Sequence, residues 1–528
     1  MSNVIVIRNI ASKLKNDPYL LSIFIVSLVF SILFTVYSAM AFNLVEMTGW
    51  DMGIYMQALS SGISGHLFYS ALVPGSYLAE HFSPILFILL IPYYLFPSAY
   101  TLIVLQSFAI GFSTLVLYLL SKEILQRIEI IRTGKWLNAS TISFIISMAY
   151  IMSPLTESPV FFDFHLMVFL PLFFFMAIYS FIKKKYILNI IFLALIVSLH
   201  STFVSIALMA ILFEIFLNRT FMITSNHSAA RSSIYFLISL GILGPYFILA
   251  GILKGDIAGV PASVLRIHVS GSVGPISLVI DTFTNPALVL HLLVHNYLLK
   301  LIIIFFAFGG FAFLFIRYPA SILTFIPYLI YSMFSTYASY YTIGYQYTMM
   351  LIPMVAVSGA IGIYMLIKSQ MHKPSFKLQL HIVLSVIIVI ALLGFSIATP
   401  IVSGDANSNS MYASVSQYGN NTYMNQVIFE HKIANSLPKN ATLVTSNNLF
   451  PLFGNDLNAT AFPFTPDVVI NGDYYQYLID DKHSMWSIET ANISGTGISL
   501  NMLEQKYMAS GNYKVYADNY GVIVLERN

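Results

Sequence analysis

Long apolar stretches alternate with short polar loops over most of the chain. Most of these stretches hold about 17–25 residues, the length that an α-helix needs to cross the hydrocarbon core of a bilayer. The pattern predicts eleven transmembrane helices, near residues 20–42, 100–121, 139–153, 166–182, 186–199, 201–217, 232–253, 300–316, 319–338, 347–367 and 378–399. The first stretch is too long for the apolar part of a cleavable signal peptide, so we interpret it as a retained helix. Pro84–Phe96 is apolar but short, which favours an interfacial or re-entrant segment.

The pattern changes after residue 399. Asn, Ser, Asp, Gly and Tyr become frequent, and short strand-like runs appear near 441–445, 468–470, 513–516 and 521–525. A stretch with helical spacing, 423–437, ends before Pro438. We therefore expect a polytopic membrane domain over 1–399 and a small α/β domain over 400–528.

The basic residues predict an orientation. Nineteen Lys and Arg residues precede residue 400, and sixteen of them are cytoplasmic if the N-terminus is inside. This bias is the one that the positive-inside rule expects. The loops 43–99 and 254–299 and the C-terminal domain then lie outside the cytoplasm, which indicates a multi-pass protein of the plasma membrane.

Composition agrees with a membrane protein and removes several classes of function. The chain is 58% hydrophobic and 9% charged, whereas an average soluble domain is about a quarter charged. It has no cysteine, which excludes disulfides, thiolate zinc sites and thiol catalysis. The sequence shows no phosphate loop, dinucleotide fingerprint or nucleic-acid-binding module, so we expect no nucleic acid partner.

The first outer loop gathers polar residues that packing alone does not explain. Asp51 opens an amphipathic stretch that includes Gln57, and the pair Glu80 and His81 closes the loop. Asp51 is a candidate general base or metal ligand, and Gln57 and Glu80 are candidate substrate-binding residues. A simpler interpretation makes Asp51 the N-cap of a helix that begins at Met52, and makes His81 a structural residue at the membrane surface.

Two further outer loops offer candidates. Asp163 and His165 have i, i+2 spacing, so both can face one cavity from an extended loop but not from a helix. Carboxylates and imidazoles from separate loops can assemble an oxygen and nitrogen metal site, here for Mg²⁺ or Mn²⁺ with Asp51 and Asp163 as ligands. Arg266 offers the cationic fork that holds a phosphate, although a solvated loop arginine is the simpler interpretation.

These motifs carry a family resemblance. The chain resembles the membrane proteins called domain of unknown function 2079 over nearly its whole length, including LPKNATLVTSNNLFPLFGN and VIVLERN in the tail. The matching positions are Asp51, Gly53, Tyr55, Gln57 and Ala58, then His81, Phe82 and Pro84, and then Asp163, Phe164 and His165. The chain departs from the family at His200, Ser201 and Thr202, where a Lys-Glu-Asp cluster is usual. The family is similar in outline to the GT-C membrane glycosyltransferases, which use lipid-phosphate-linked sugars.

The resemblance implies a GT-C-like glycosyltransferase that moves a sugar from a polyprenyl-phosphate donor to an acceptor on the outer face. In this hypothesis Asp51 is the base or a metal ligand, and Arg266 holds the lipid phosphate. His81, Asp163 and His165 position substrate or metal. Two other classes of function stay open: a non-catalytic membrane scaffold or envelope-assembly protein, and a transporter. A transporter is disfavoured because the charges gather at one face and no inverted repeat is visible.

Overall fold

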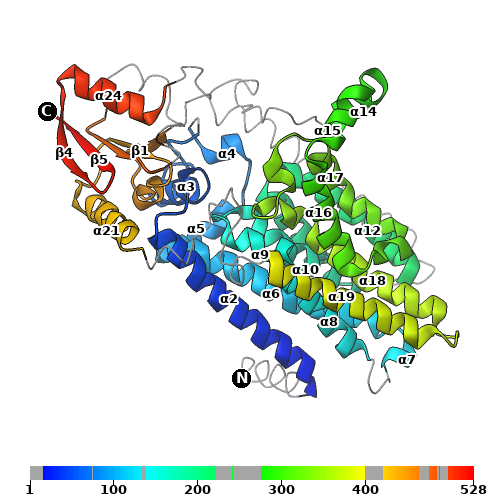
Figure 1. The fold of residues 1–528 in the computed structure, drawn as a ribbon. Helices are drawn as coiled ribbons and strands as arrows, with labels where there is room; N and C mark the ends of the chain where they lie inside the picture. The colour runs from blue at the N-terminus through cyan, green and yellow to red at the C-terminus, as the bar shows by residue number, and fades with distance from the viewer. Residues whose placement is uncertain are drawn as a thin grey trace.

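The computed structural model describes residues 16–73, 75–132, 138–221, 239, 241, 275–398, 420–462, 475–484, 487 and 498–528. Helices form one part of the molecule, and a five-stranded sheet with two helices forms the other (Figure 1). The predicted class, an α-helical polytopic membrane protein with a small C-terminal α/β unit, is confirmed. The boundary predicted between residues 399 and 400 lies outside the described residues and stays a prediction.

Within the described residues, five helical segments are long and apolar enough to cross a membrane. They contain α2 (Pro18–Asn43), α6 (Ala99–Leu125), α12 (Val204–Phe221), α18 (Ile352–Gln370) and α19 (Phe376–Ala398). Two bent pairs could each form one broken span: α8 (Ala139–Ile151) with α9 (Pro154–Phe161), at 44°, and α15 (Pro286–Val294) with α16 (Tyr297–Phe308), at 65°. The shorter helices are α5 (Leu86–Leu95), α10 (Leu170–Ile182), α11 (Tyr186–Leu199) and α17 (Ile322–Met333). The remaining helices of this part are α3 (Ile54–Ile63), α4 (Tyr77–Glu80), α7 (Glu129–Arg132) and α14 (Pro275–Thr284).

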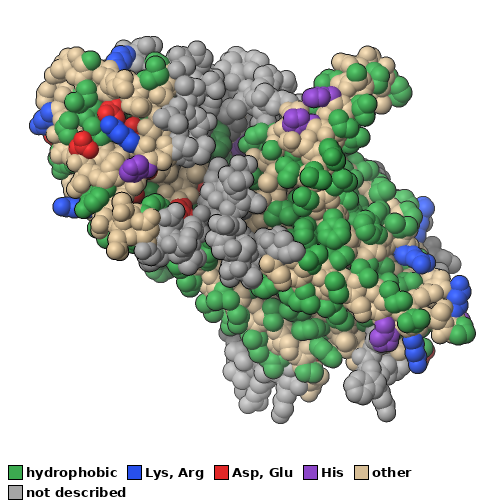
Figure 2. Space-filling model, in the orientation of Figure 1, with side chains coloured by type: hydrophobic (Ala, Val, Ile, Leu, Met, Phe, Trp, Pro, Cys, Tyr) green, Lys and Arg blue, Asp and Glu red, His purple; other side chains and the backbone are tan. Residues whose placement is uncertain are grey.

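Each predicted span that falls in the described residues contains a helix, whereas the range 232–253 lies outside them except for residues 239 and 241. The total of eleven stays a prediction, because several of these helices are shorter than a bilayer is thick. α5 is 10 residues long, in line with the short segment expected there. Apolar side chains cover the helical part, and Lys and Arg gather at its end away from the sheet (Figure 2).

Small residues let α2 and α6 pack closely. Ser31 Oγ of α2 donates to the backbone oxygen of Ser27 at 2.8 Å and lies 3.3 Å from the backbone oxygen of Ser107 in α6. A Cβ atom at Gly111 would lie 2.7 Å from the Ser27 carbonyl oxygen, which is too close for any side chain. Such small-residue contacts are the usual way in which membrane helices approach one another.

The sheet has the strand order β2-β1-β3-β5-β4. Its strands are β1 (Leu443–Ser446), β2 (Ala459–Phe462), β3 (Tyr477–Asp481), β4 (Tyr513–Asn519) and β5 (Val522–Arg527). β1 pairs in parallel with β2 and β3, and β5 pairs antiparallel with β3 and β4. Strands predicted near 441–445, 513–516 and 521–525 are present, 468–470 lies outside the described residues, and β2 and β3 were not predicted. The helices α21 (Asn421–Ser436) and α24 (Leu500–Ser510) complete this part.

The sheet packs against the segment that follows α2. α3 lies beside β1 in Figure 1. Gln57 Nε2 donates to the carbonyl oxygens of Asp456 and Ala459 at 2.8 and 2.9 Å, so α3 is tied to the start of β2. The Tyr423 hydroxyl of α21 donates to the carbonyl oxygen of Leu44 at 2.7 Å. We call this end of the helical part the sheet side.

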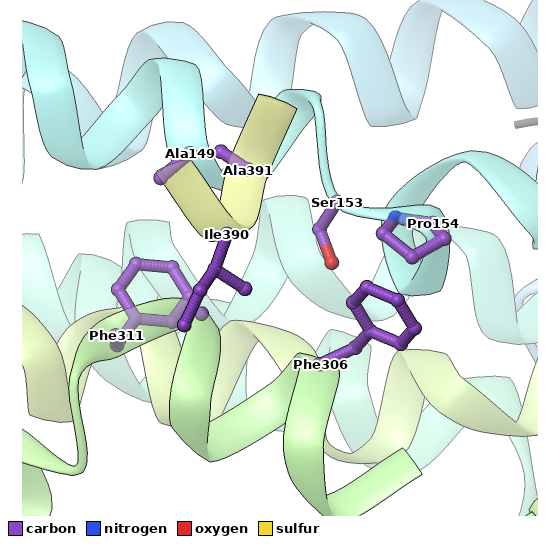
Figure 3. Close-up of a pocket in the computed structure, with 8 residues that line it drawn as sticks. Ala149, Ser153, Pro154, Phe306, Phe311, Ile390 and Ala391 are labelled. Atoms are coloured by element: carbon purple, nitrogen blue, oxygen red, sulfur yellow. The ribbon is translucent and has the colours of Figure 1, made fainter. Parts of the chain in front are cut away.

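A small apolar cavity lies where α8 and α9 meet. Phe306, Phe311 and Ile390 line it with Ser153, as Figure 3 shows. Its volume of about 10 Å³ matches one water molecule at most. The cavity is therefore a packing defect at a helix bend rather than a substrate site.

Candidate functional site

Asp51 lies on a π-helical turn, η1 (Gly49–Gly53), that leads into α3. The N-cap position of this turn is Thr48, so Asp51 lies inside the helix. The simpler interpretation of Asp51 as the N-cap of a helix from Met52 is therefore wrong. π-Helical turns are rare and occur frequently at functional sites. The turn leaves 13% of the Asp51 side chain exposed.

Asp163 holds the start of this turn. Its Oδ2 accepts hydrogen bonds from the backbone nitrogen and the hydroxyl of Thr48, at 2.7 and 2.6 Å. The residue is completely buried, and Oδ1 has no hydrogen-bond partner among the described residues. One oxygen of Asp163 is thus used in the fold, and the other is buried beside the turn.

His165 faces Asp51 from the segment between α9 and the 3-10 turn η2 (Leu166–Phe169). Its backbone is extended, as the i, i+2 argument required, and its Nε2 lies 4.0 Å from Asp51 Oδ1. Nδ1 accepts a hydrogen bond from the backbone nitrogen of Met167 at 3.4 Å. We therefore assign the proton of the neutral ring to Nε2, which points a donor toward Asp51.

Burial sets the protonation of the three groups. It raises the pKa of Asp51 well above its usual value, and the neighbouring Asp163 carboxylate raises it further. Burial also raises the pKa of Asp163 to about 7, although the hydrogen bonds from Thr48 oppose the rise. The pKa of His165 falls to about 3 through burial, with a smaller contribution from His200. His165 is neutral at pH 7, so its contact with Asp51 is not an ion pair.

His81 joins the site through a row of aromatic rings. The ring centroids of His165 and Tyr55 are 5.7 Å apart, and those of Tyr77 and His81 are also 5.7 Å apart. The hydroxyls of Tyr55 and Tyr77 lie 2.6 Å from each other, which closes the row. His81 in turn lies against His200, with a centroid distance of 4.4 Å. The four residues predicted as catalytic are thus brought to one region of the sheet side.

The structure does not place the predicted substrate-binding residues Gln57, Glu80 and Arg266 in the site. Both groups of the Gln57 amide are paired within the protein, because Oε1 also accepts from Ser70 Oγ at 2.9 Å and from the backbone nitrogen of Ala71 at 2.7 Å. These contacts join two parts of the fold and give a substrate-binding role no support. The Glu80 side chain and Arg266 lie outside the described residues, so their roles stay predictions.

Tyrosines approach Asp51 from the segment before α18. The ring of Tyr345 lies 5.2 Å from that of Phe162, next to Asp163 in the chain. The Asp51 carboxylate contributes to the raised pKa of Tyr345, after burial and the neighbouring Tyr337. Tyr340 packs against Tyr331 and Tyr347, at centroid distances of 4.2 and 4.6 Å. An aromatic wall beside a carboxylate is a surface on which a sugar ring can stack.

Sequence reasoning missed two residues of this region, Thr48 and Asn447. Thr48 donates twice to Asp163, and Asn447 contacts the turn of Asp51 through both its backbone and its side chain. The available signal was the pair Asn447 and Asn448 directly after a strand, inside a tail segment already recognised as family-like. The sequence alone could not show that Asn447 contacts the turn of Asp51.

The acids fit a divalent cation only in part. Asp51 and Asp163 supply oxygen ligands of the kind that Mg²⁺ and Mn²⁺ prefer. Across the part of the chain that the structure describes, no three His, Cys, Asp or Glu residues are grouped so that they could hold a metal ion. A cation here would need ligands from a substrate, as Mg²⁺ often has from phosphates.

Several solved structures are similar to this chain in outline. ArnT from Cupriavidus metallidurans bound to undecaprenyl phosphate is 14% identical, with a TM-score of 0.49, over 96% of this chain and 98% of ArnT. The Archaeoglobus fulgidus oligosaccharyltransferase in the apo form is 11% identical, with a TM-score of 0.48, over 97% and 74% of the two chains. Archaeal oligosaccharyltransferase AglB from Archaeoglobus fulgidus, in complex with an inhibitory peptide and a dolichol-phosphate, is 12% identical, with a TM-score of 0.44, over 95% and 74%.

Curated proteins give no match to the chain. A family model does match it, over residues 41–524, and its description is a predicted membrane protein. The matched range includes the turn of Asp51, the Asp163 and His165 segment, and the C-terminal sheet up to the middle of β5. The chain therefore belongs to the DUF2079 family of predicted membrane proteins.

Proposed function

We propose that the protein is a membrane glycosyltransferase that moves a sugar from a polyprenyl-phosphate donor to a hydroxyl acceptor. The observation that carries the proposal is the position of Asp51. It is partly exposed on a π-helical turn, 4.0 Å from the neutral His165 ring and beside the buried Asp163. A carboxylate that is raised in pKa, reachable and faced by a proton donor is suited to general base catalysis.

The 4.0 Å gap between Asp51 Oδ1 and His165 Nε2 is too wide for a hydrogen bond and leaves space for a bridging oxygen. In the proposed reaction the acceptor hydroxyl occupies this place. Its oxygen accepts from His165 Nε2–H, and it gives its proton to Asp51 as that oxygen attacks the anomeric carbon of the sugar. The bond from that carbon to the phosphate oxygen breaks, and polyprenyl phosphate leaves with the electron pair.

A divalent cation, Mg²⁺ or Mn²⁺, belongs to the proposal. Asp51 and the unpartnered Oδ1 of Asp163 would hold it, and the cation would stabilise negative charge on the phosphate that leaves. The cation is proposed from the chemistry of these two carboxylates. Treatment with EDTA, followed by re-addition of Mg²⁺ or Mn²⁺, tests this part separately from the role of Asp51 as base.

The experiment compares the wild type with Asp51→Asn. Purified protein is incubated with a panel of undecaprenyl- and dolichyl-phosphate hexoses and a membrane extract of the host as acceptor source. Loss of sugar from the lipid is followed by mass spectrometry. Asp51→Asn should abolish turnover without changing the yield of folded protein, because the amide is nearly isosteric but has no basicity. The proposal would be refuted if Asp51→Asn kept full turnover, or if the wild type turned over none of the donors.

A second function, a non-catalytic scaffold, is favoured by one observation. Asp163 Oδ2 is used entirely in holding Thr48, which a purely structural acid would also do. A scaffold function does not explain why Asp51 is partly exposed or why it faces His165. Under this alternative Asp51→Asn and the wild type behave alike in every binding and turnover assay.

A further inference from the structure

The turn η1 receives its cap from a distant part of the chain. Thr48 occupies the N-cap position but accepts no cap hydrogen bond, and its hydroxyl donates to Asp163 instead. The N–H groups at the start of a helix need partners from outside it. The backbone oxygen of Asn447 accepts from Gly49 N at 2.8 Å, and its side-chain Oδ1 accepts from Trp50 N at 3.1 Å.

The C-terminal sheet reaches the turn without a gap. Asn447 follows β1 directly and is completely buried, and Phe450 lies in the next turn, η10 (Phe450–Phe453). A Cβ atom at Gly49 would lie 2.8 Å from Asn447 Oδ1, and one at Gly53 would lie 2.4 Å from Phe450 Cδ1. Glycines at both ends of η1 are what allow the sheet to approach so closely.

We infer that Asn447 is a positioning residue, which caps η1 from the C-terminal sheet and holds Asp51 in place opposite His165. The inference rests on the proposed function for the role of Asp51 as base, but the cap itself does not depend on it. Within the side chain only Oδ1 takes part, since Asn447 Nδ2 has no hydrogen-bond partner among the described residues. The C-terminal part therefore belongs to the active site and completes it.

The chemistry of caps supplies a matched set of variants. Asn and Asp are both good N-caps, whereas Ala has no acceptor. Asn447→Asp keeps the oxygen that Trp50 uses, and an anion at a helix start is favoured by the helix dipole. Asn448→Ala is the control, because the Asn448 amide donates to Asp481 Oδ2 at 2.9 Å within the sheet itself.

Hydrogen exchange measured by mass spectrometry tests the cap on the full chain in detergent. We expect Asn447→Ala to speed exchange of the Gly49 to Gly53 amides by about five- to thirtyfold. Asn447→Asp should restore protection, and Asn448→Ala should leave it as in the wild type. If Asn447→Ala does not express, Asn447→Ser, whose hydroxyl is shorter than the amide, takes its place with the same expectation. Unchanged exchange, or equal acceleration by Asn448→Ala, would overturn the inference.

Donor turnover separates positioning from mere stability. Asn447→Ala should lower kcat at least tenfold and change KM for the lipid donor less than twofold, with recovery in Asn447→Asp. A fall in kcat without rescue by Asp, or faster exchange with an unchanged kcat, would also count against a positioning role. If Asp51→Asn keeps full turnover, the proposed function fails, but the exchange data still decide whether Asn447 caps the turn.

Discussion

At the scale of single residues, the carboxylates of Asp51 and Asp163 lie in one site but have different surroundings. Asp51 has exposed surface and a proton donor opposite, whereas Asp163 is buried and accepts two short hydrogen bonds from Thr48. Burial raises the pKa of both carboxyl groups. They repel one another as anions, so they titrate as a pair rather than singly.

The pair predicts how stability depends on pH. The folded pKa of Asp163, about 7, lies above the value of an unfolded aspartate, so the folded state binds the proton more tightly. The stability that this provides is fully present below about pH 4 and is lost as the pH rises through 7. The thermal midpoint in detergent should therefore fall between pH 5 and 8, and Asp163→Asn should flatten the fall. If the thermal midpoint fell equally steeply with pH in the wild type and in Asp163→Asn, the raised pKa of Asp163 would be contradicted.

Thr48 predicts how activity depends on pH. A base must be ionised, so donor turnover should rise with pH and reach half its maximum near the pKa of the coupled pair. The Thr48 hydroxyl lowers the pKa of Asp163, so Asp163 in Thr48→Val should keep its proton to higher pH and repel Asp51 less, and the rise in turnover should move to lower pH. A hydrogen bond to a charged group is worth about 1.5–3 kcal/mol, which corresponds to a rise of about one unit or more in the pKa of Asp163. Thr48→Ser keeps the hydroxyl and serves as the control; a profile shifted equally by both variants would exclude the hydrogen bond as the cause.

Most candidates at this scale could be predicted because chemistry limits which residue types act as bases or donors. Asp51, Asp163 and His165 were chosen for that reason, and the structure brings them together. Asn447 could not be chosen, since an asparagine after a strand is an ordinary loop residue until its partner is known. The substrate-binding role of Gln57 stays a prediction, and in the structure both groups of its amide join two parts of the fold.

At the scale of elements, helices were predictable because their apolar length is dictated by the bilayer. The strands β2 and β3 were not, because four or five residues carry too little periodicity to be recognised alone. The helix α9 was also missed, because it lies in a segment that was predicted as an outer loop.

The contact between α2 and α6 provides a prediction at this scale. Gly111→Ala should push the two helices apart, because its Cβ would lie 2.7 Å from the Ser27 backbone oxygen, which cannot rotate away. Overpacking of this kind costs roughly 1–3 kcal/mol. The thermal midpoint should drop, while Gly310→Ala, where a Cβ meets nothing within 4 Å, should leave it unchanged. Similar midpoints for the two variants would show that α2 can move aside at little cost.

At the scale of the whole molecule, the site depends on both parts of the chain. Asn447 and Trp50 are 397 residues apart, yet they share a hydrogen bond beside the proposed base. The sheet therefore lies on the same side of the membrane as Asp51, Asp163 and His165, whichever side that is. The positive-inside rule predicts that this side is outside the cytoplasm.

The absence of cysteine from the sequence allows a direct test of this orientation. A single cysteine at Gln505, exposed on α24, should react with a membrane-impermeant maleimide in intact cells. A single cysteine at His372, exposed in the turn between α18 and α19, should react only after the cells are permeabilised. The two positions carry no charge of their own that the positive-inside rule counts, so the substitutions leave the signal for orientation intact. The reverse pattern would place the sheet and the site in the cytoplasm, where a donor would have to be presented from the inner leaflet. Labelling of both positions in intact cells would instead indicate damaged membranes. The wild type has no cysteine and cannot reveal such damage, so a cytoplasmic marker protein that contains cysteine serves as the control.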